Sequence, residues 1–399
     1  MEIQGNSIIG FNSAPQSDTS IKAINPSTGL EIEPPFYSAE SETVEQAATL
    51  ASQAFLIYSK KSSQERASFL NEIATQIESI GEPLVTRAMQ ETGLPEGRIK
   101  GETGRTTGQL RLFASLIEDG SWTQARIETA LPDRAPLPRP DIRSMSRPLG
   151  PVVVFAASNF PLAFSTAGGD TASALAAGCP VIVKAHSSHP GTAELIAHAV
   201  QKAAEITGMP DGVFSLLFGG GRSVGSALVT HPAIKAVGFT GSTAGGTALM
   251  EVAAKRSEPI PVYAEMGSVN PVVLLPEAVA QNGDAIAAGL HVSATMGVGQ
   301  FCTNPGVVCI KNDAAGDALV KSFVEKMNGT AAQVMLNPTI HRAYCDGVTQ
   351  LQKNDKVKAL VSGSANDEDS PCLGAAAVFE TSASSFLEDE SLSHEIFGP

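Results

Sequence analysis

The chain has 399 residues, which is too many for one small hydrophobic core, so two or more domains are expected. Its composition, 43% hydrophobic and 17% charged, is typical of a globular protein and excludes a disordered chain. The formal net charge of −14 argues against nucleic acid as a main partner, because phosphate binding needs a basic face.

The cysteines and the chain ends carry further expectations. The five cysteines are odd in number and widely spaced, and no pair has C-x-x-C spacing, so neither a metal site nor a disulfide framework is indicated. The first ten residues lack the pattern of a secretory leader, and no run of about 18 apolar residues predicts a membrane span. We therefore expect a cytoplasmic protein. The chain stops at HEIFGP, in what reads as the middle of a loop, so a C-terminal truncation is expected.

The first third of the chain is predicted to be mainly helical. Residues 41–58 carry apolar side chains at helical spacing. A second helix is expected after Ser62, which forms a capping-box pattern with Glu65. Residues 85–120 predict one or two more helices. The proline-rich stretch 131–148 predicts an extended connection or an edge strand.

From residue 151 onward, short apolar β-branched runs alternate with helical runs, which predicts a parallel sheet covered on both faces. The expected strands are 151–157, 180–184, 213–218, 234–240 and 261–266. Ligands of such sheets bind at the carboxyl ends of the strands, so the residues after each strand are candidates for a site. A second α/β segment is expected after residue 270.

Three of these strand ends offer groups that suit a nucleotide. Lys184 closes an apolar strand, where a lysine either reaches solvent along its own stem or binds a ribose or phosphate. The glycine clusters at 219–221 and 241–246 let backbone N–H groups approach a pyrophosphate. Neither cluster matches the usual G-x-G-x-x-G pattern. Asn159, after the first strand, offers an amide, although taken alone it is better explained as a turn-forming asparagine before Phe-Pro.

Two further residues suit covalent chemistry. Glu265 lies in an apolar segment, so it is either a buried carboxylate bonded to backbone or a base whose pKa burial raises. Cys302 lies in the loop-forming stretch GVGQFCTNPG, residues 297–306, where a thiol is placed to act as a nucleophile. The other four cysteines, Cys179, Cys309, Cys345 and Cys372, are expected to be small core hydrophobes.

Taken together, six motifs resemble the aldehyde dehydrogenase superfamily in their order. They are N-F-P at 159–161, Lys184, F-T-G-S at 239–242 with Gly246, E-M-G at 265–267, G-Q-F-C at 299–302 and E-I-F-G-P at 395–399. The resemblance implies an α/β fold with a Rossmann-type parallel-sheet cofactor domain, a second α/β catalytic domain and a small oligomerisation element. The implied divisions are 1–120 for N-terminal helices of the cofactor domain, 121–148 for the oligomerisation excursion, 149–266 for the Rossmann-type domain and 267–399 for an incomplete catalytic domain.

The resemblance also implies a mechanism. The Cys302 thiolate attacks an aldehyde, while the Asn159 side chain and the Cys302 N–H form the oxyanion hole. Hydride passes to a nicotinamide, and Glu265 activates the water that hydrolyses the thioester. The implied cofactor-binding residues are Lys184, Ser187, Arg222, Gly225, Phe239, Gly241, Ser242, Gly246, Glu395 and Phe397, and no metal ion is involved. Because Ser187 stands where NAD-preferring members often carry an acid, NADP is expected, held by Lys184, Ser187 and Arg222, with NAD as the alternative.

The stretches AEMGSVNP (264–271), GRTTGQLRLF (104–113) and KAHSSHPG (184–191) are similar to those of the 2,5-dioxovalerate (α-ketoglutaric semialdehyde) dehydrogenases. This similarity implies oxidation of 2,5-dioxopentanoate to 2-oxoglutarate, with Arg105 and Phe160 at the substrate. Arg105 either pairs with the distal carboxylate of the substrate or faces solvent or Glu102. The alternatives are an NADP-dependent fatty aldehyde dehydrogenase and an inactive nucleotide-binding fragment. An acylating enzyme that releases CoA esters is disfavoured by Glu265. A homodimer or homotetramer is expected for the full-length form.

Overall fold

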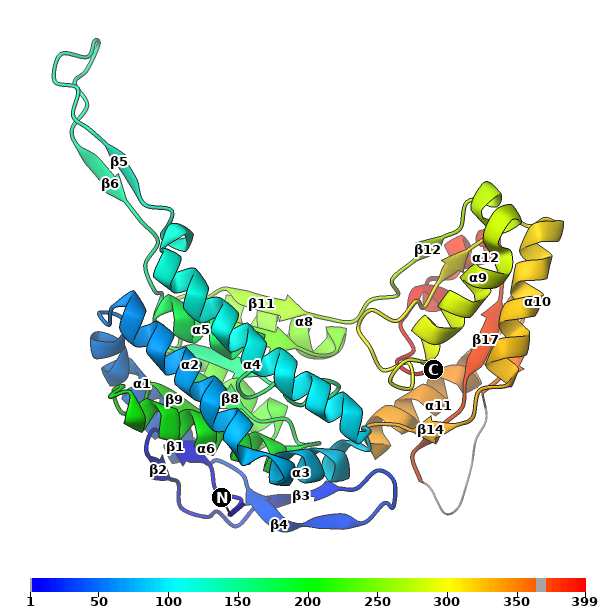
Figure 1. Ribbon diagram of the computed structural model, residues 1–399, viewed down its shortest axis with the longest axis horizontal. Helices are drawn as coiled ribbons and strands as arrows, with labels where there is room; N and C mark the ends of the chain where they lie inside the picture. The colour runs from blue at the N-terminus through cyan, green and yellow to red at the C-terminus, as the bar shows by residue number, and fades with distance from the viewer. Residues whose placement is uncertain (1, 364–370) are drawn as a thin grey trace. The chain divides into compact units, whose positions relative to one another are not determined.

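The computed structural model describes residues 2–363 and 371–399. The chain divides into two compact units (Figure 1). The first unit comprises Met1–Lys22, Pro34–Arg87 and Gly97–Glu265, and the second unit comprises Ala23–Glu33, Ala88–Glu96 and Met266–Pro399. No helix among the described residues is both long and apolar enough to cross a membrane.

The first unit is built around a seven-stranded sheet with the order β11-β10-β7-β8-β9-β1-β2. Its parallel strands are β7 (Val152–Phe155), β8 (Val181–Lys184), β9 (Phe214–Leu217), β10 (Ala236–Thr240) and β11 (Val262–Glu265). These five strands confirm the predicted ones. Two antiparallel strands that the sequence analysis missed, β1 (Ile8–Ile9) and β2 (Asn12–Ser13), extend the sheet beyond β9. The sheet is therefore mixed rather than wholly parallel.

The strand order reverses once. The chain runs outward from β7 through β8 to β9, and then returns to the other side of β7 with β10 and β11. A reversal of this kind opens a crevice outside the carboxyl ends of the two central strands, here β7 and β10. The register places Phe155 beside Lys184 and Thr240 beside Glu265, so these strands end at one common edge.

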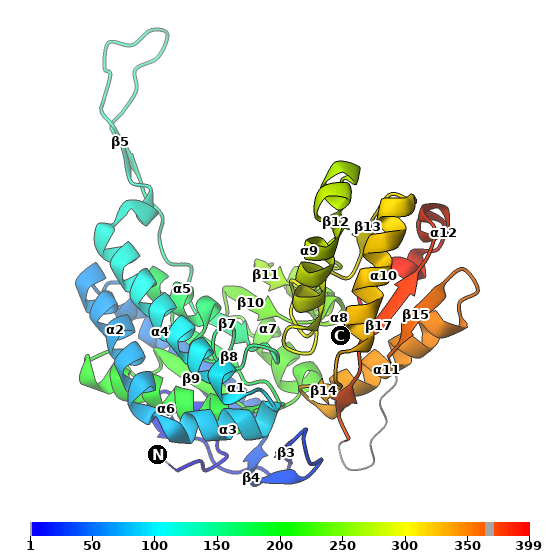
Figure 2. The same ribbon diagram turned by 45° about the vertical axis from the view of Figure 1, so that its right-hand side comes forward.

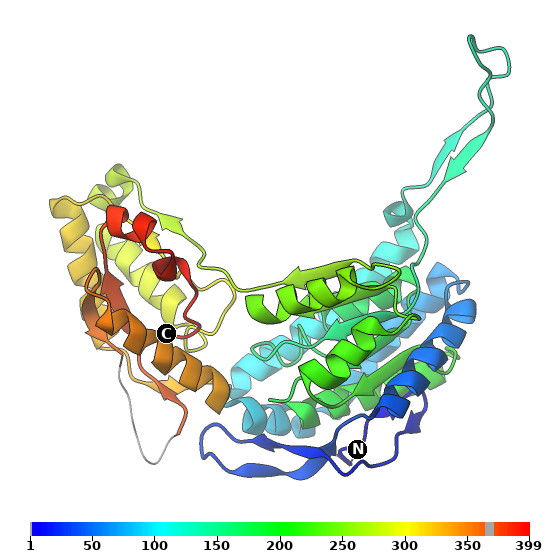
Figure 3. The same ribbon diagram turned by 180° about the vertical axis from the view of Figure 1, so that it is seen from behind.

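Helices cover both faces of this sheet. They are α1 (Ser41–Tyr58), α2 (Ser63–Ile80), α4 (Glu96–Asp119), α5 (Gly169–Ala177), α6 (Pro190–Ile206), α7 (Ser226–Thr230) and α8 (Thr243–Ala254), and α3 (Glu82–Thr92) passes from the first unit into the second. α5 contacts β7 and β8, α6 contacts β9, and α2 packs on both helices. α1 contacts β8 and β9, and α7 contacts α1 and α8. Figure 3 shows α7 and α8 on the side turned away from the viewer in Figure 1.

The local sequence signals for the first two helices are confirmed. α1 begins and ends at the predicted residues, and seven of its side chains, among them Val44 and Tyr58, are buried. At the start of α2 the Glu65 N–H donates to the Ser62 hydroxyl at 3.2 Å, and the Ser62 N–H donates to the Glu65 carboxylate at 2.8 Å. This reciprocal pair is a capping box, which satisfies two backbone donors that the helix leaves open.

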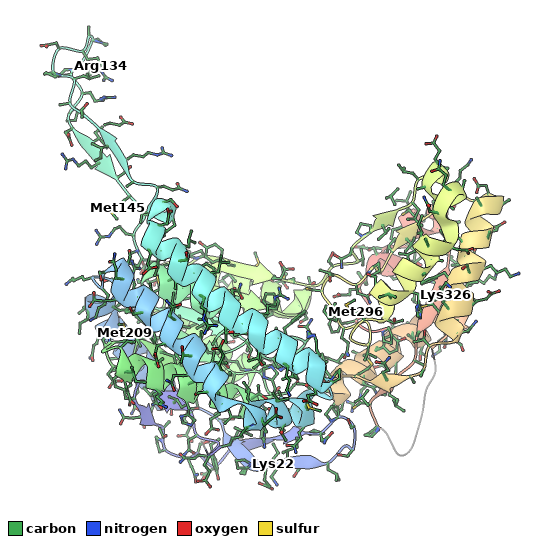
Figure 4. All side chains as sticks on the ribbon, viewed as in Figure 1. Lys22, Arg134, Met145, Met209, Met296 and Lys326 are labelled. Atoms are coloured by element: carbon green, nitrogen blue, oxygen red, sulfur yellow. The ribbon has the colours of Figure 1, made fainter. Side chains whose placement is uncertain are left out.

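The proline-rich stretch forms an exposed excursion from the first unit (Figure 2). Strands β5 (Arg126–Glu128) and β6 (Ile142–Ser144) pair antiparallel, and Arg134 lies near the tip of the excursion in Figure 4. Ile127 and Leu137 are each 68% exposed, which is unusual for large apolar side chains in one segment. A second hairpin that the sequence analysis missed joins β3 (Ser20–Ile24) to β4 (Glu31–Tyr37).

The second unit combines short strand pairs with helices, as expected for a second α/β segment. Its strands are β12 (Val272–Val273) with β13 (Val308–Cys309), β14 (Gln333–Val334) with β16 (Leu373–Gly374), and β15 (Lys358–Ser362) with β17 (Ala377–Glu380). Its helices are α9 (Pro276–Thr295), α10 (Ala314–Asn328), α11 (Pro338–Lys353) and α12 (Ala383–Glu388). α9 packs along α10, and buried Met335, Tyr344 and Val348 form a small core with Val298.

Candidate active site

The predicted residues of the first unit come together at one edge of its sheet. Asn159 follows β7, Lys184 ends β8, Arg222 follows β9, Gly241 follows β10 and Glu265 ends β11. Because the five strands are parallel and paired in register, all five ends lie on the same side of the sheet. The strand-end rule therefore gathers residues that are up to about a hundred positions apart in the chain.

Lys184 is the buried cation of this edge. Its residue is 9% exposed, and burial lowers its pKa to about 8. Among residues 2–363 and 371–399, no group pairs with its ammonium. Three residues on, Ser187 is exposed, and the rings of His186 and His189 stack with centroids 5.5 Å apart. A buried cation without a carboxylate partner suits an anionic ligand.

Two glycine-rich turns flank this lysine. Gly220 leads into a π-helical turn, η2 (Gly221–Gly225), that contacts β8 and carries the exposed Arg222. A Cβ at Gly225 would lie 2.8 Å from the Phe155 ring, so a side chain there would displace that ring. The turn is thus a close-packed strand-to-helix connection of the kind that admits a phosphate.

The second turn follows β10. A Cβ at Gly241 would lie 2.8 Å from the ring of Phe239, which is itself buried and 6.0 Å from Phe155. Ser242 is the N-cap of α8 and accepts a hydrogen bond from the Gly245 N–H at 3.2 Å, while Gly246 is buried in the first turn of α8. Phe239 therefore supports the turn from beneath. The backbone N–H groups at the start of α8 suit a pyrophosphate, so this edge fits a nicotinamide dinucleotide.

Asn159 and Phe160 lie on the turn after β7. Phe160 is 6% exposed, and its ring packs edge to face on Phe164 at 5.0 Å. The Arg105 guanidinium lies 4.8 Å from the Phe164 ring and 5.5 Å from the Phe160 ring. Glu102 pairs directly with Arg98 at 2.9 Å, and it interacts with the Arg105 charge more weakly. Arg105 is exposed, so its guanidinium is open to a ligand beside this aromatic pair.

One expectation for the first unit is wrong. Glu265 is exposed, not buried, because it is the last residue of β11, an edge strand of the sheet. Its backbone is nevertheless held, because the Gly241 N–H donates to the Glu265 carbonyl at 3.0 Å. The carboxylate is therefore positioned by the strand rather than by burial.

In the second unit, Cys302 lies on a tightly held loop. Gly297, Val298 and Gly299 follow α9 with φ angles of +59°, +59° and +64°, a left-handed run that glycine adopts readily and valine does not. Cys302 is half-buried. The Asn270 side chain donates to the Cys302 carbonyl at 2.6 Å and to the Asn304 carbonyl at 2.9 Å. One amide therefore holds the backbone at Cys302 and two residues after it.

Asn270 was not among the predicted site residues. Its φ of +40° is unusual for a residue with a side chain, and asparagine tolerates it better than most. The sequence signal that could have found it is the Asn-Pro pair at 270–271, which marks a turn. Glu102 and Arg98 were also missed as neighbours of Asn159.

The E-I-F-G-P segment lies against the same loop of the second unit. The Asn304 side chain donates to the Gly398 carbonyl at 3.1 Å and to the Gly299 carbonyl at 2.9 Å. Partial desolvation raises the pKa of Glu395, and a hydrogen bond from the Ser268 N–H opposes that rise. Phe397 is half-buried and lies between Glu395 and Gly398 in this segment.

The remaining cysteines follow the expectation in part. Cys179 and Cys372 are buried, and burial raises the pKa of both thiols. Cys345 is half-buried. Cys309 is exposed at the end of the two-residue strand β13, so the prediction of a core position is wrong for it.

The chain belongs to the aldehyde dehydrogenase family, whose model matches residues 13–399. It is an NAD(P)-dependent oxidoreductase that acts on aldehydes. Among similar proteins, Alpha-ketoglutaric semialdehyde dehydrogenase 2 of Azospirillum brasilense is 50% identical over 400 residues, which cover 100% of this chain and 76% of that protein. The alpha-ketoglutaric semialdehyde dehydrogenase of Acinetobacter baylyi is 48% identical over 368 residues, or 91% of this chain and 69% of that protein.

A solved structure supports the fold. HpcC from Thermus thermophilus superposes with a TM-score of 0.86 over 99% of this chain and 75% of its own, at 21% identity. At that identity the likeness establishes the architecture and not the substrate.

Proposed function

We propose that this chain oxidises α-ketoglutaric semialdehyde (2,5-dioxopentanoate) to 2-oxoglutarate with NADP. The observation that carries the proposal is the similarity, at 50% identity over the whole chain, to a protein named for that aldehyde. The exposed Arg105 beside Phe160 and Phe164 agrees with it, because the substrate has a carboxylate at the end remote from the aldehyde.

The roles proposed for the chain's own groups follow from their chemistry. The Cys302 thiolate forms the bond to the aldehyde carbon, and the oxygen that becomes negative accepts hydrogen bonds from the Asn159 amide and the Cys302 N–H. When bound, the nicotinamide supplies the acceptor for the hydride. Glu265 then takes a proton from the water that cleaves the Cys302 thioester, which releases the acid and restores the thiolate.

The preference for NADP rests on the charges at the β8 edge. Lys184 is a buried ammonium without a carboxylate partner in the described ranges, Ser187 adds a hydroxyl, and Arg222 adds an exposed guanidinium on the neighbouring η2 turn. A 2′-phosphate carries the negative charge that such a set attracts, whereas a ribose hydroxyl does not.

A panel of aldehydes tests the substrate. We expect higher kcat/KM for α-ketoglutaric semialdehyde than for hexanal, and a loss of about 10- to 100-fold for the acidic aldehyde alone in Arg105→Ala, because a charged hydrogen bond contributes roughly 1.5 to 3 kcal/mol. Arg111→Ala is the matched control, since Arg111 is on the same helix and pairs with Glu78 at 2.6 Å. An equal loss for both aldehydes would refute the carboxylate role, and a preference for hexanal would favour a fatty aldehyde dehydrogenase.

The cofactor is tested in the same assay. Arg222→Ala should raise KM for NADP several-fold more than KM for NAD, with Lys255→Ala, an exposed i,i+4 pair member, as the control. Comparable efficiency with the two cofactors in the unmodified chain would contradict the NADP preference.

We also propose the organisation of the protein. The first unit serves as the cofactor-binding domain and the second as the catalytic domain, while residues 121–148 join copies of the chain into a homodimer or homotetramer in the cytoplasm. The exposed Ile127 and Leu137 of the excursion support that role. Light scattering of the Ile127→Asp variant tests it: a smaller particle is expected, and an unchanged one would exclude the excursion from the interface.

A further inference from the structure

Glu102 of α4 is a buried carboxylate that none of the proposed chemical roles uses. It is 4% exposed, and burial raises its pKa against the opposing effects of Arg98, two backbone N–H groups and the more weakly acting Arg105. Burial of a carboxylate is costly, so its contacts indicate what it does.

Those contacts converge on one short segment. One carboxylate oxygen accepts hydrogen bonds from the N–H groups of Leu162 at 2.9 Å and Ala163 at 3.0 Å. The other oxygen accepts from the Arg98 guanidinium at 2.9 Å. Leu162 and Ala163 come directly after Asn159-Phe160-Pro161, so Glu102 fixes the backbone just beyond the asparagine.

Arg98 holds the same segment at the asparagine itself. Its second terminal nitrogen donates to the Asn159 carbonyl at 3.3 Å, and its guanidinium lies 4.4 Å from the centroid of the Phe160 ring. The ion pair therefore contacts the segment at Asn159, Phe160, Leu162 and Ala163.

The segment needs such support because it is irregular. Its base is closed by a backbone hydrogen bond from the Ala157 N–H to the Phe164 carbonyl at 2.9 Å, and the Phe164 N–H donates to the Phe160 carbonyl at 3.3 Å. Neither Asn159 nor Phe160 belongs to a helix or strand. The His189 ring meets the base of the segment at the Ala157 carbonyl, 2.8 Å away, whereas the ion pair contacts it at Asn159 and beyond. The Asn159 side chain is attached to the backbone beside the carbonyl that Arg98 holds, so a displacement of this backbone would move the side-chain amide, and the contacts of Arg98 and Glu102 oppose that displacement.

We propose that Glu102 and Arg98 are positioning residues that hold Asn159 in the orientation in which its amide donates to the oxyanion. The inference rests on the proposed oxyanion role of Asn159. It gives α4 a part in the reaction through the backbone of the 159–163 segment, in addition to the part that Arg105 plays toward the substrate.

A double-mutant cycle tests the inference. Glu102→Gln keeps the shape and one carbonyl oxygen, but it loses the ion pair with Arg98. We expect kcat for the aldehyde to fall about 10- to 100-fold, since small misplacements of catalytic groups cost that much. In the Asn159→Ala background the same substitution should cost less than about 2-fold, because the group that it positions is absent.

Two readouts separate positioning from general damage. Alkylation of Cys302 by iodoacetamide needs the thiolate but no oxyanion, so its rate should change less than about 2-fold in Glu102→Gln. NADPH affinity, measured by its fluorescence, should be equally unaffected. Glu78→Gln is the matched control, because it breaks an exposed ion pair between α2 and Arg111 of α4 that lies outside the segment, and it should leave kcat unchanged.

The outcomes are distinct. Equal losses of kcat for Glu102→Gln in both backgrounds would overturn the inference while leaving the role of Asn159 intact. An Asn159→Ala variant with unchanged kcat would instead refute the oxyanion role, and the inference with it. If Glu102→Gln does not fold, Arg98→Lys takes its place in the cycle. Its single ammonium keeps the charge beside Glu102 but loses the second donor that reaches the Asn159 carbonyl. The same coupling with Asn159→Ala is then expected, and its absence would overturn the inference.

Discussion

Replacing Lys184 with methionine should make the protein more stable and its nucleotide site weaker. Lys184 ends a buried strand, and burial lowers its pKa from 10.5 to about 8. At about 1.36 kcal/mol per pKa unit, this lowering corresponds to roughly 3 kcal/mol of destabilisation whenever the lysine is charged. Methionine has a similar length and no charge, so Lys184→Met should raise the free energy of unfolding by up to that amount near neutral pH.

The pH dependence gives this prediction its sign. The native pKa lies below the unfolded one, so between about pH 8 and 10.5 the unfolded chain binds more protons and the stability of the unmodified protein rises with pH. Below that window the penalty is fully present, and above it both states hold a neutral lysine. The advantage of the methionine variant should therefore be largest below about pH 8 and vanish above about pH 10.5.

Urea unfolding of both proteins across this range measures the difference. Lys255→Met is the control, since Lys255 is exposed and should show no pH-dependent difference. NADPH fluorescence on the same samples should show affinity reduced by about 10- to 100-fold in Lys184→Met only. A stability difference that does not change with pH, or a methionine variant that is less stable at neutral pH, would refute the argument from burial.

Three further substitutions address the held turns and the helix start. Asn270→Asp replaces a donor to two carbonyls by a carboxylate that repels them, so we expect a loss of about 1 to 3 kcal/mol in unfolding free energy and a lower kcat. Unchanged kcat together with an unchanged rate of Cys302 alkylation would contradict this expectation. Gly299→Ala places a Cβ on the Gly398 carbonyl at a φ of +64°, and kcat should fall at least about 10-fold; a fully active variant would show that the two segments separate freely. Ser62→Ala should lower unfolding free energy by about 1 kcal/mol in urea without changing kcat, and no loss would mean that the capping box contributes little.

The elements predicted correctly are those with a strong local pattern. The short runs that became β7 to β9 are buried on both faces and therefore apolar almost throughout. β1 and β2 were missed because each strand has two residues, which are too few to show the alternation of apolar and polar side chains. Ile8 and Ile9 are buried and pair with Leu216 and Ser215, positions more than two hundred residues away. Such a pairing depends on long-range tertiary contacts, which local strand propensity does not predict.

The site divides in the same way. Chemistry-bearing residues at strand ends could be found because parallel topology itself gathers them at one edge. The exposure of Glu265 could not be predicted, because it depends on β11 being the edge strand of the sheet, and the sequence does not give the strand order. Arg98 and Glu102 have the i,i+4 spacing of an ordinary helix ion pair, and only the folded chain shows that Glu102 is buried against the backbone after Asn159.

A common principle links the two proposed reactive side chains. Asn159 and Cys302 both lie on irregular backbone, where neither helix nor strand hydrogen bonds fix the chain. On each segment one polar side chain makes two hydrogen bonds to the backbone: Glu102 accepts from two N–H groups beyond Asn159, and Asn270 donates to the carbonyls of Cys302 and Asn304. Glu102 is an acceptor because its backbone partners are N–H groups, and Asn270 acts as a donor because its backbone partners are carbonyls. An ionised carboxylate only accepts and therefore suits backbone N–H groups, whereas an amide N–H₂ donates and suits backbone carbonyls, so the two side chains are not interchangeable. Replacing Glu102 by a donor, or Asn270 by an acceptor, should therefore lower activity more than the same kind of replacement at an exposed residue nearby.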